Sequence, residues 1–339
     1  MQENNQSLAI HQEEDEQWKQ SIAARVFLNH FFGIHYHIRH TEENSKLADL
    51  DRFRNYAPRM NEASLDMTKR MLLNAWNTEY ALRNTASMGD DSFLSNALHW
   101  TFPQAYYCVW YSLRAFLATQ GVMTNDEMNI RRRTSRLVAN SYYPRYLSFY
   151  ADGPLDHYHV HRLPRGHRKP GLLLADTPFE AQAQVGQFLR TTRTLQLRSL
   201  RQKLQTNPAI ALRSERTGKI LEKFSQQNWQ ELSDRIGLTT FLDLFSRLRI
   251  SSTNREIERF VNIDLDFKLF NVCLLDIVDH INAVHEAYVV KAMGVAAYRE
   301  FLASLPEYLQ NSFVQRRFTE RIRPEIDTRL FPLTGQIAA

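Results

Sequence analysis

Cysteine is almost missing from this chain of 339 residues, since only Cys108 and Cys273 are present. Both lie inside apolar stretches with helical spacing, and two such residues are too few for a disulfide framework or a zinc knuckle. We therefore expect a reducing, cytoplasmic compartment. The first residues are polar and then acidic, which argues against a signal peptide.

Glycine is scarce as well, with 11 residues in the whole chain. Neither G-x-x-x-x-G-K nor G-x-G-x-x-G occurs, and the G-x-S-x-G pattern of serine hydrolases is missing too. Nucleotide-driven motors, Rossmann enzymes and such hydrolases are therefore excluded as function classes. No remaining motif requires a cofactor, and we expect none.

The one long apolar run covers residues 102–120, and it is interrupted by Arg114 and rich in tyrosine. A membrane span needs about 18 or more apolar residues with few or no charges, so we expect no contact with a membrane. The apolar residues of this run recur at helical spacing, Pro103 suits an early helical position, and Gly121 suits a helix end. We predict that it is the central helix of a helical core.

Helical spacing extends over most of the chain and predicts an all-α, multi-helix bundle. Residues 1–12 are expected to be a disordered tail, and a helix is expected to begin near Glu13, where acidic residues match the positive end of the helix dipole. Residues 33–40 are expected to continue as a short extended piece. The further predicted helices cover residues 65–86, 124–142, 179–204, 217–235, 238–249, 254–291 and 295–318.

Residues 144–178 are rich in proline and glycine and are the least helical part of the chain. Within them, His157–His161 alternates at period two and predicts a short β-hairpin or an irregular basic loop near residues 150–172. This segment is the expected junction between an N-terminal helical part, residues 13–143, and a C-terminal helical part, residues 179–339. Three histidines on one strand face can bind a metal, but the flanking cations favour contact with an anion.

A second polar cluster lies on the predicted helix 254–291, where Asp276 and His280 are one turn apart. Asp279, His285 and Glu286 are close to them along the same helix. No Glu-x-x-His motif of di-iron bundles occurs, so we interpret the cluster as a polar helix edge or as satisfied internal hydrogen bonds, not as a metal site.

The net charge of +5 is distributed unevenly. Between Arg131 and Lys223 there are eighteen Lys and Arg residues against six acidic residues, a net charge of +12, whereas the rest of the chain carries −7. Most of these cations are arginines, whose planar guanidinium holds phosphate through two hydrogen bonds and stacks on bases. A polyanionic partner, RNA or another nucleic acid, is the resulting hypothesis. The alternative is that the rest of the fold neutralises this charge.

Three groups of cations are predicted to hold phosphate. One lies on and just after helix 124–142, one in the loop after His161, and one on helix 179–204, where four arginines fall near one face. Aromatic residues from Tyr142 to Tyr150 are candidates for stacking on unpaired bases, with core packing as the alternative. The candidate cations are Arg131, Arg132, Arg133, Arg136, Arg145, Arg165, Arg168, Lys169, Arg190, Arg193, Arg198 and Arg201.

Residues 65–121 resemble the first two helices of a HEPN-type domain, a likeness that extends toward residue 206 if later helices complete the bundle. The resemblance implies a helical bundle, usually dimeric, that binds or cuts RNA in prokaryotic toxin and antiviral defence systems. The residues that carry it are Arg70-Met-Leu-Leu-Asn-Ala-Trp76, Ser95-Asn-Ala-Leu98, and Tyr106-Tyr107 followed by Ala115, Leu117 and Gly121.

Catalytic members of that family carry Arg, four to six residues, and then His, so the resemblance implies a metal-independent endoribonuclease where such a pair is in place. The guanidinium would hold the phosphate as charge develops, and the imidazole would move a proton near the ribose 2′-hydroxyl. Two stretches have this spacing, Arg25 to His30 and Arg162 to His167. The spacing is common by chance in a chain with 12 histidines, so structural context has to decide.

A second hypothesis comes from another class of protein. In it, the basic middle of the chain docks on an acidic protein, and the chain is a non-catalytic interaction subunit of a prokaryotic defence or mobile-element complex. Protection of RNA by the protein favours the first hypothesis. Tight binding to a protein partner without nucleic acid favours the second.

Overall fold

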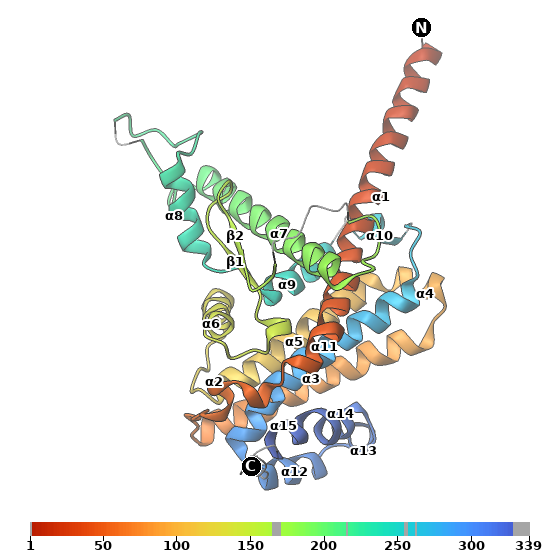
Figure 1. The fold of residues 1–339 in the computed structure, drawn as a ribbon. Helices are drawn as coiled ribbons and strands as arrows, with labels where there is room; N and C mark the ends of the chain where they lie inside the picture. Colours follow the sequence, from red (N-terminus) through yellow and green to blue (C-terminus); the bar gives the residue numbers. More distant parts are fainter. Residues whose placement is uncertain (1, 165–170, 215, 254–256, 262, 328–339) are drawn as a thin grey trace, which may run out of the picture.

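A computed structural model of the chain describes residues 2–164, 171–214, 216–253, 257–261 and 263–327. It confirms the predicted all-α, multi-helix bundle with one small β-hairpin (Figure 1). The elements are α1 Gln2–Thr41, α2 Asp51–Arg54, α3 Glu62–Met88, α4 Asp91–Asn96, α5 Leu98–Ala118, α6 Glu127–Ala139, β1 Tyr150–Asp152, β2 His159–His161, α7 Pro178–Thr206, α8 Gln226–Ile236, α9 Phe241–Ser251, α10 Glu258–Val261, α11 Phe267–Met293, α12 Val295–Ala303, α13 Glu307–Gln310, α14 Phe313–Arg317, a π-helical turn Phe318–Ile322, and α15 Arg323–Asp327.

α5 is the central helix of the bundle, as predicted, and it packs against α3, α9 and α11. Phe102, Val109 and Phe116 are fully buried on its inner side, and they recur at the helical spacing seen in the sequence. The helix begins at Leu98, earlier than expected, so that Pro103 lies inside it. Its end is marked by Gly121, whose φ of +76° turns the chain away.

α1 is one long helix, and its N-terminal part projects beyond the bundle (Figure 1). Residues 2–12 and 33–40 are therefore helical, where the sequence predicted a disordered tail and an extended piece. Extending a helix that already exists costs little, which favours continuation in both directions. At Gly33 the missing side chain lets α7 come close, because a Cβ there would lie 2.8 Å from Gln184 Oε1.

The predicted hairpin is present, with β1 and β2 antiparallel and Ala151 opposite Val160. Beyond it, the described residues between 194 and 236 form a projecting arm, made of the second half of α7, the connection that follows, and α8 (Figure 1). The arm has its own small apolar cluster, separate from the main core. The cluster consists of Leu197, Leu204 and Leu232, with Leu155, Leu200, Leu212, Phe224, Trp229 and Ile236 packed against them.

Helices from both sides of residues 144–178 share one hydrophobic core. α11 packs against α5, α3 and α1, and one continuous cluster of buried apolar side chains includes residues from α1 to α14. The short helices α12 to α15 cover one end of this bundle (Figure 1). The two helical parts expected from the sequence therefore meet in a common core.

Four of the expected helices are shorter or broken. The described residues of the predicted helix 254–291 form two helices, α10 and α11, and residues 263–266 between them are not helical. The predicted helix 217–235 begins only at Gln226, because Gly218 with a φ of +66° belongs to a turn. The predicted helix 295–318 is divided into α12, α13 and α14, and Pro306 stands at the start of α13. Helix 124–142 begins after Asp126, whose carboxylate accepts hydrogen bonds from the N–H groups of Met128 and Asn129.

We predict that Gly121→Ala lowers the free energy of unfolding by about 2 kcal/mol. A positive φ costs an L-residue about 1 to 2 kcal/mol, and a Cβ at this position would lie 3.3 Å from the Arg59 carbonyl oxygen. Gly218→Ala is the control, since its φ is also positive but nothing lies within 4 Å of the added Cβ. Urea unfolding measures both, and equal losses would show that Arg59 does not contribute.

Candidate functional site

The first candidate catalytic pair is not accessible. His30 is 4% exposed, its ring lies 4.7 Å from that of Phe188, and its Nδ1 donates to the Val26 carbonyl oxygen. Burial, with the charge of Arg247 nearby, lowers the pKa of His30 to about 4. A neutral imidazole inside the core cannot reach a polymer, so this structure does not support a catalytic role for Arg25 and His30.

The second candidate pair is only partly described. Arg162 donates to the carbonyl oxygens of Val138 at 3.0 Å and Ala139 at 2.7 Å, and to Ser141 Oγ. Its guanidinium therefore satisfies the C-terminal end of α6, where carbonyl groups lack partners. His167 lies outside the described residues, as do Arg165, Arg168 and Lys169.

Arg193 does not belong to an exposed arginine face, although the helical wheel placed it there. It is 1% exposed and donates to the carbonyl oxygens of Gly153 and Gly237 at 2.6 and 2.7 Å. It also donates to Ser233 Oγ at 2.7 Å and to Thr239 Oγ1. The side chain ties the hairpin and the base of the arm to α7, so its role is structural.

Arg131 and the aromatic residues that follow helix α6 are likewise occupied. Arg131 forms an ion pair with Asp243, which is 4% exposed and also accepts a hydrogen bond from Gln196 at 2.8 Å. Tyr143 is 1% exposed and Phe149 is fully buried. The alternative of core packing is correct for these two rings, which are not available for stacking on bases.

The remaining described candidates lie at or near the surface. Arg132, Arg133, Arg136, Arg145 and Arg198 are exposed, and Arg190 and Arg201 are half-buried. The guanidinium of Arg201 lies 5.4 and 5.7 Å from the rings of Phe224 and Trp229, and that of Arg190 lies 4.8 Å from the Tyr158 ring. Arg132 also reaches the Arg235 carbonyl oxygen across to α8, which brings α6 beside the arm.

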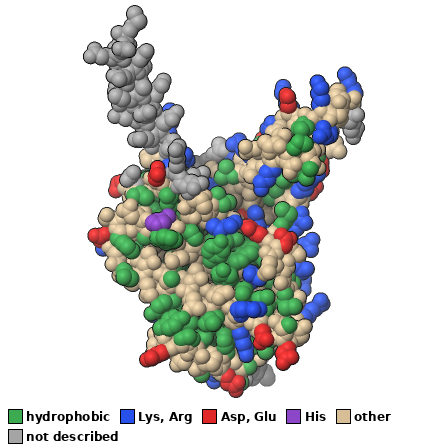
Figure 2. Space-filling view, turned by 180° about the vertical axis from the view of Figure 1, so that it is seen from behind, with side chains coloured by type: hydrophobic (Ala, Val, Ile, Leu, Met, Phe, Trp, Pro, Cys, Tyr) green, Lys and Arg blue, Asp and Glu red, His purple; other side chains and the backbone are tan. Residues whose placement is uncertain are grey.

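The arm carries further cations outside the three groups predicted to hold phosphate. Lys203, Arg213, Arg216, Lys219 and Lys223 are exposed, and the sequence signal for them was only the local excess of charge. Figure 2 shows Lys and Arg side chains gathered on the projecting arm and down the edge of the body below it. We call the following set the basic arm surface: Arg132, Arg133, Arg136, Arg198, Lys203, Arg213, Arg216, Lys219 and Lys223.

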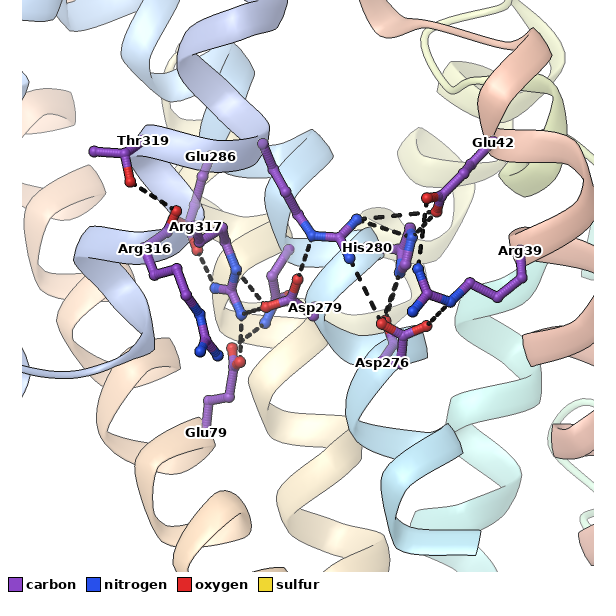
Figure 3. Close-up of polar contacts among 12 residues, drawn as sticks. Arg39, Glu42, Glu79, Asp276, Asp279, His280, Glu286, Arg316, Arg317 and Thr319 are labelled. Atoms are coloured by element: carbon purple, nitrogen blue, oxygen red, sulfur yellow. Dashed lines mark hydrogen bonds and ion pairs between the residues drawn. The ribbon is translucent and has the colours of Figure 1, made fainter. Parts of the chain in front are cut away.

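A second group of charges is buried and serves the fold (Figure 3). Arg317 of α14 is surrounded by three carboxylates: it contacts Glu79 of α3, and it lies 2.8 Å from Asp279 and 2.7 Å from Glu286 of α11. Burial by itself lowers the pKa of Arg317, but the three negative charges raise it well above its ordinary value. Trp76 Nε1 donates to Glu286 at 3.1 Å, which satisfies the carboxylate further.

The same network continues toward the surface along α11 (Figure 3). Arg321 Nε lies 2.8 Å from Asp279 Oδ2, Arg39 Nε lies 3.1 Å from Asp276, and His280 contacts Glu42. The interpretation of this helix edge as satisfied internal hydrogen bonds is confirmed. These contacts fasten the end of α1 and the C-terminal helices to α11.

A chain of hydrogen bonds also runs inward from Glu79. Asn282 Nδ2 donates to Glu79 at 2.9 Å, Ser112 Oγ donates to the Asn282 oxygen, and Ser112 lies 2.8 Å from His285 Nδ1. His285 Nε2 is 2.9 Å from the Tyr143 hydroxyl. Burial lowers the pKa of His285 to about 3, so it is neutral. Ser112 and His285 are both fully buried, which excludes substrate from this serine and histidine pair.

The histidines of the hairpin are the last candidates. His161 stacks on the Tyr150 ring at 4.5 Å, and its Nε2 lies 3.1 Å from Asp152 Oδ1. Within the described ranges, no group of three or more His, Cys, Asp or Glu side chains is placed to hold a metal ion. Nor does any helix of these ranges have the length and apolar character needed to cross a membrane.

Comparisons with known proteins give no relative: no family model, curated protein or solved structure matches the chain.

We predict that His30→Gln weakens the loss of stability at acid pH. The folded pKa of about 4 lies below the ordinary value of 6.5, so protonation favours unfolding. The contribution is fully present above pH 6.5 and is lost as the pH falls through 4, which amounts to about 2 to 3 kcal/mol. Unfolding by urea at pH 7 and pH 4 measures this loss, and equal losses in both proteins would contradict the assignment.

We predict that Arg317→Met costs about 3 to 5 kcal/mol of stability, because it leaves the buried carboxylate of Glu286 without its cation and leaves Glu79 paired with Arg83 alone. Arg316→Met is the matched control, because Arg316 is the adjacent residue and its side chain is exposed. We expect it to change the free energy of unfolding by no more than about 0.5 kcal/mol. Urea unfolding at neutral pH compares the two. Similar midpoints for both variants would mean that the buried cluster does not hold the fold.

Proposed function

We propose that this protein binds RNA through the basic arm surface. The observation that carries the proposal is the concentration of exposed Lys and Arg side chains on α6 and on the projecting arm. The acidic residues described on the arm are Glu222, Glu231 and Asp234, and Glu231 is paired with Arg235. When the paired charges are left out of the count, positive charges still outnumber negative charges on this surface.

The shape of the arm supports a polyanion as its partner. A projecting element presents its charges on more than one side, and clustered cations attract phosphates from a distance and release their counterions on binding. The arm is fastened at its base by the hydrogen bonds of Arg193 and internally by the cluster around Leu204. Binding to a held surface costs less conformational entropy than binding to a loose one.

RNA is preferred over other polyanions for two reasons. Most cations of the middle segment are arginines, which contact both phosphates and bases. In addition, α3 and α5, the helices in which the HEPN-like residues lie, pack closely against each other. The proposal covers binding. For cleavage, one candidate pair is buried, and the other has its arginine bound to α6 and its histidine outside the described ranges.

We predict that Arg198→Ala, Lys203→Ala and Lys219→Ala together weaken RNA binding and reduce its salt dependence. Each phosphate contact contributes about 0.7 to 0.9 to the slope of log K against log salt, so the slope should fall by about 2. Fluorescence anisotropy with labelled single-stranded RNA in EDTA, at several salt concentrations, measures both quantities. Denaturing gels of the same mixtures report any cleavage.

The control for this triple variant carries Arg299→Ala and Arg316→Ala, which remove exposed cations from the C-terminal helices. We expect it to bind RNA as the wild type does. If the wild type does not bind RNA at low salt, the proposal is wrong, and docking of the arm on an acidic protein becomes the better explanation. Equal losses in both variants would show that net charge acts without a defined surface.

A further inference from the structure

The exposed face of α5 is aromatic. Trp100, Tyr107 and Tyr111 fall within about 40° of one another on a helical wheel, spaced about 10 and 6 Å along the helix axis. Trp100 is 64% exposed, Tyr107 is 36% exposed and Tyr111 is half-buried. The rings of Tyr107 and Tyr111 are stacked, with centroids 5.9 Å apart and planes 26° from parallel. We call these three residues the aromatic row.

Two cations lie at the C-terminal end of the aromatic row. Arg114 follows Tyr111 on the same helix face, and Arg70 lies on α3, the helix that packs against α5. Burial, and then the charge of Arg70, lowers the pKa of Arg114. Arg114 donates to the side-chain oxygen of Asn125, and Arg70 Nη2 lies 3.9 Å from the sulfur of Met67. Both of these partners are uncharged. Two cations on adjoining helices attract an anion.

Arg70 also borders a shallow hollow between α3 and α12. The hollow has a volume of about 560 Å³, and the aromatic ring in its wall is that of Phe301. Lys69 Nζ lies 5.8 Å from the centroid of this ring. The lining residues are Ala63, Asp66, Lys69, Arg70, Leu73 and Phe301. Phe301 itself is occupied, because its ring also packs against Trp76, with centroids 5.5 Å apart. The hollow therefore contributes cations, Lys69 and Arg70, to this surface.

We propose that this face binds an unpaired segment of RNA. Its bases stack on the aromatic row, and its phosphates lie at Lys69, Arg70 and Arg114. This inference rests on the proposed function, because it states which form of RNA the protein takes. Stacking on aromatic side chains is the common way in which proteins hold single strands without reading their sequence.

The chemistry of the face favours unpaired RNA over duplex RNA and over a protein partner. The bases of a duplex are stacked on one another and cannot reach rings on a helix surface. A protein partner would have to bury Arg70 and Arg114, which is costly without paired carboxylates. α5 contains no acidic residue that would repel phosphate, and the one acidic residue that lines the hollow is Asp66, beside the two cations Lys69 and Arg70. Figure 2 shows hydrophobic side chains in the middle and lower part of the face on which the arm is also visible.

The test compares two labelled probes with the full chain, an oligouridine and an RNA duplex of the same length. We expect Tyr107→Ala with Tyr111→Ala to weaken oligouridine binding at least fivefold, the lower end of what loss of stacking produces. The slope of affinity against salt and the affinity for the duplex should stay unchanged. Tyr107→Phe with Tyr111→Phe keeps the rings and should bind oligouridine as the wild type does.

Leu173→Ala with Leu174→Ala removes exposed apolar side chains elsewhere and serves as the control. Urea unfolding shows whether each variant is folded. If the double Ala variant is not, Trp100→Ala, which removes an exposed ring of the aromatic row, tests the stacking instead. If the Ala variant loses affinity equally for both probes, or for neither, the inference is wrong and the proposed function still stands. Failure of the wild type to bind either probe overturns both. If the wild type sediments as a dimer, and only the Ala variant is a monomer while its RNA binding is unchanged, the aromatic row is a contact between two copies of the chain.

Discussion

The buried ion cluster around Arg317 is the interaction on which the arrangement of the long helices depends. One guanidinium, taken fully out of water, is compensated by Glu79 of α3 and by Asp279 and Glu286 of α11. Such a cluster tolerates little displacement, because each buried charge is costly once its partner moves away. The hydrogen bonds through Asn282 and Ser112 continue it to α5, so three long helices are held in one register.

The helices held in this way carry the two surfaces for which we propose RNA binding. α5 turns its inner side to the core, and its outer side therefore presents the aromatic row at fixed spacing. The arm stands apart from that core and depends on Arg193, which joins it to the hairpin through backbone carbonyl groups. Arginine suits both situations, since its five donors satisfy several oxygens inside the protein and bind phosphates outside it.

Much of the fold follows from local patterns in the sequence. The period of apolar residues indicated the central helix and the long helix that ends near residue 291, and the alternation at His157–His161 indicated the hairpin. Local patterns gave the wrong secondary structure where contacts between distant segments determine it. α1 continues through Gly33 because α7 lies close against it, which no pattern within α1 reveals. The break of the expected helix 295–318 into short pieces likewise accompanies its packing over the end of α3 and α11.

By itself, the sequence determined the helical class, the central helix and the excess of positive charge in the middle of the chain, because period and charge are properties of neighbouring residues. Only the tertiary structure decided which of those charges reach solvent. Arg193 was indistinguishable from Arg198 in the sequence, yet the carbonyl groups of Gly153 and Gly237, about forty residues away on either side, bury the first and leave the second exposed. His30 is buried for the same reason, since Phe188 reaches it from a distant helix. Burial depends on partners remote in the chain, and the function of a charged side chain depends on burial.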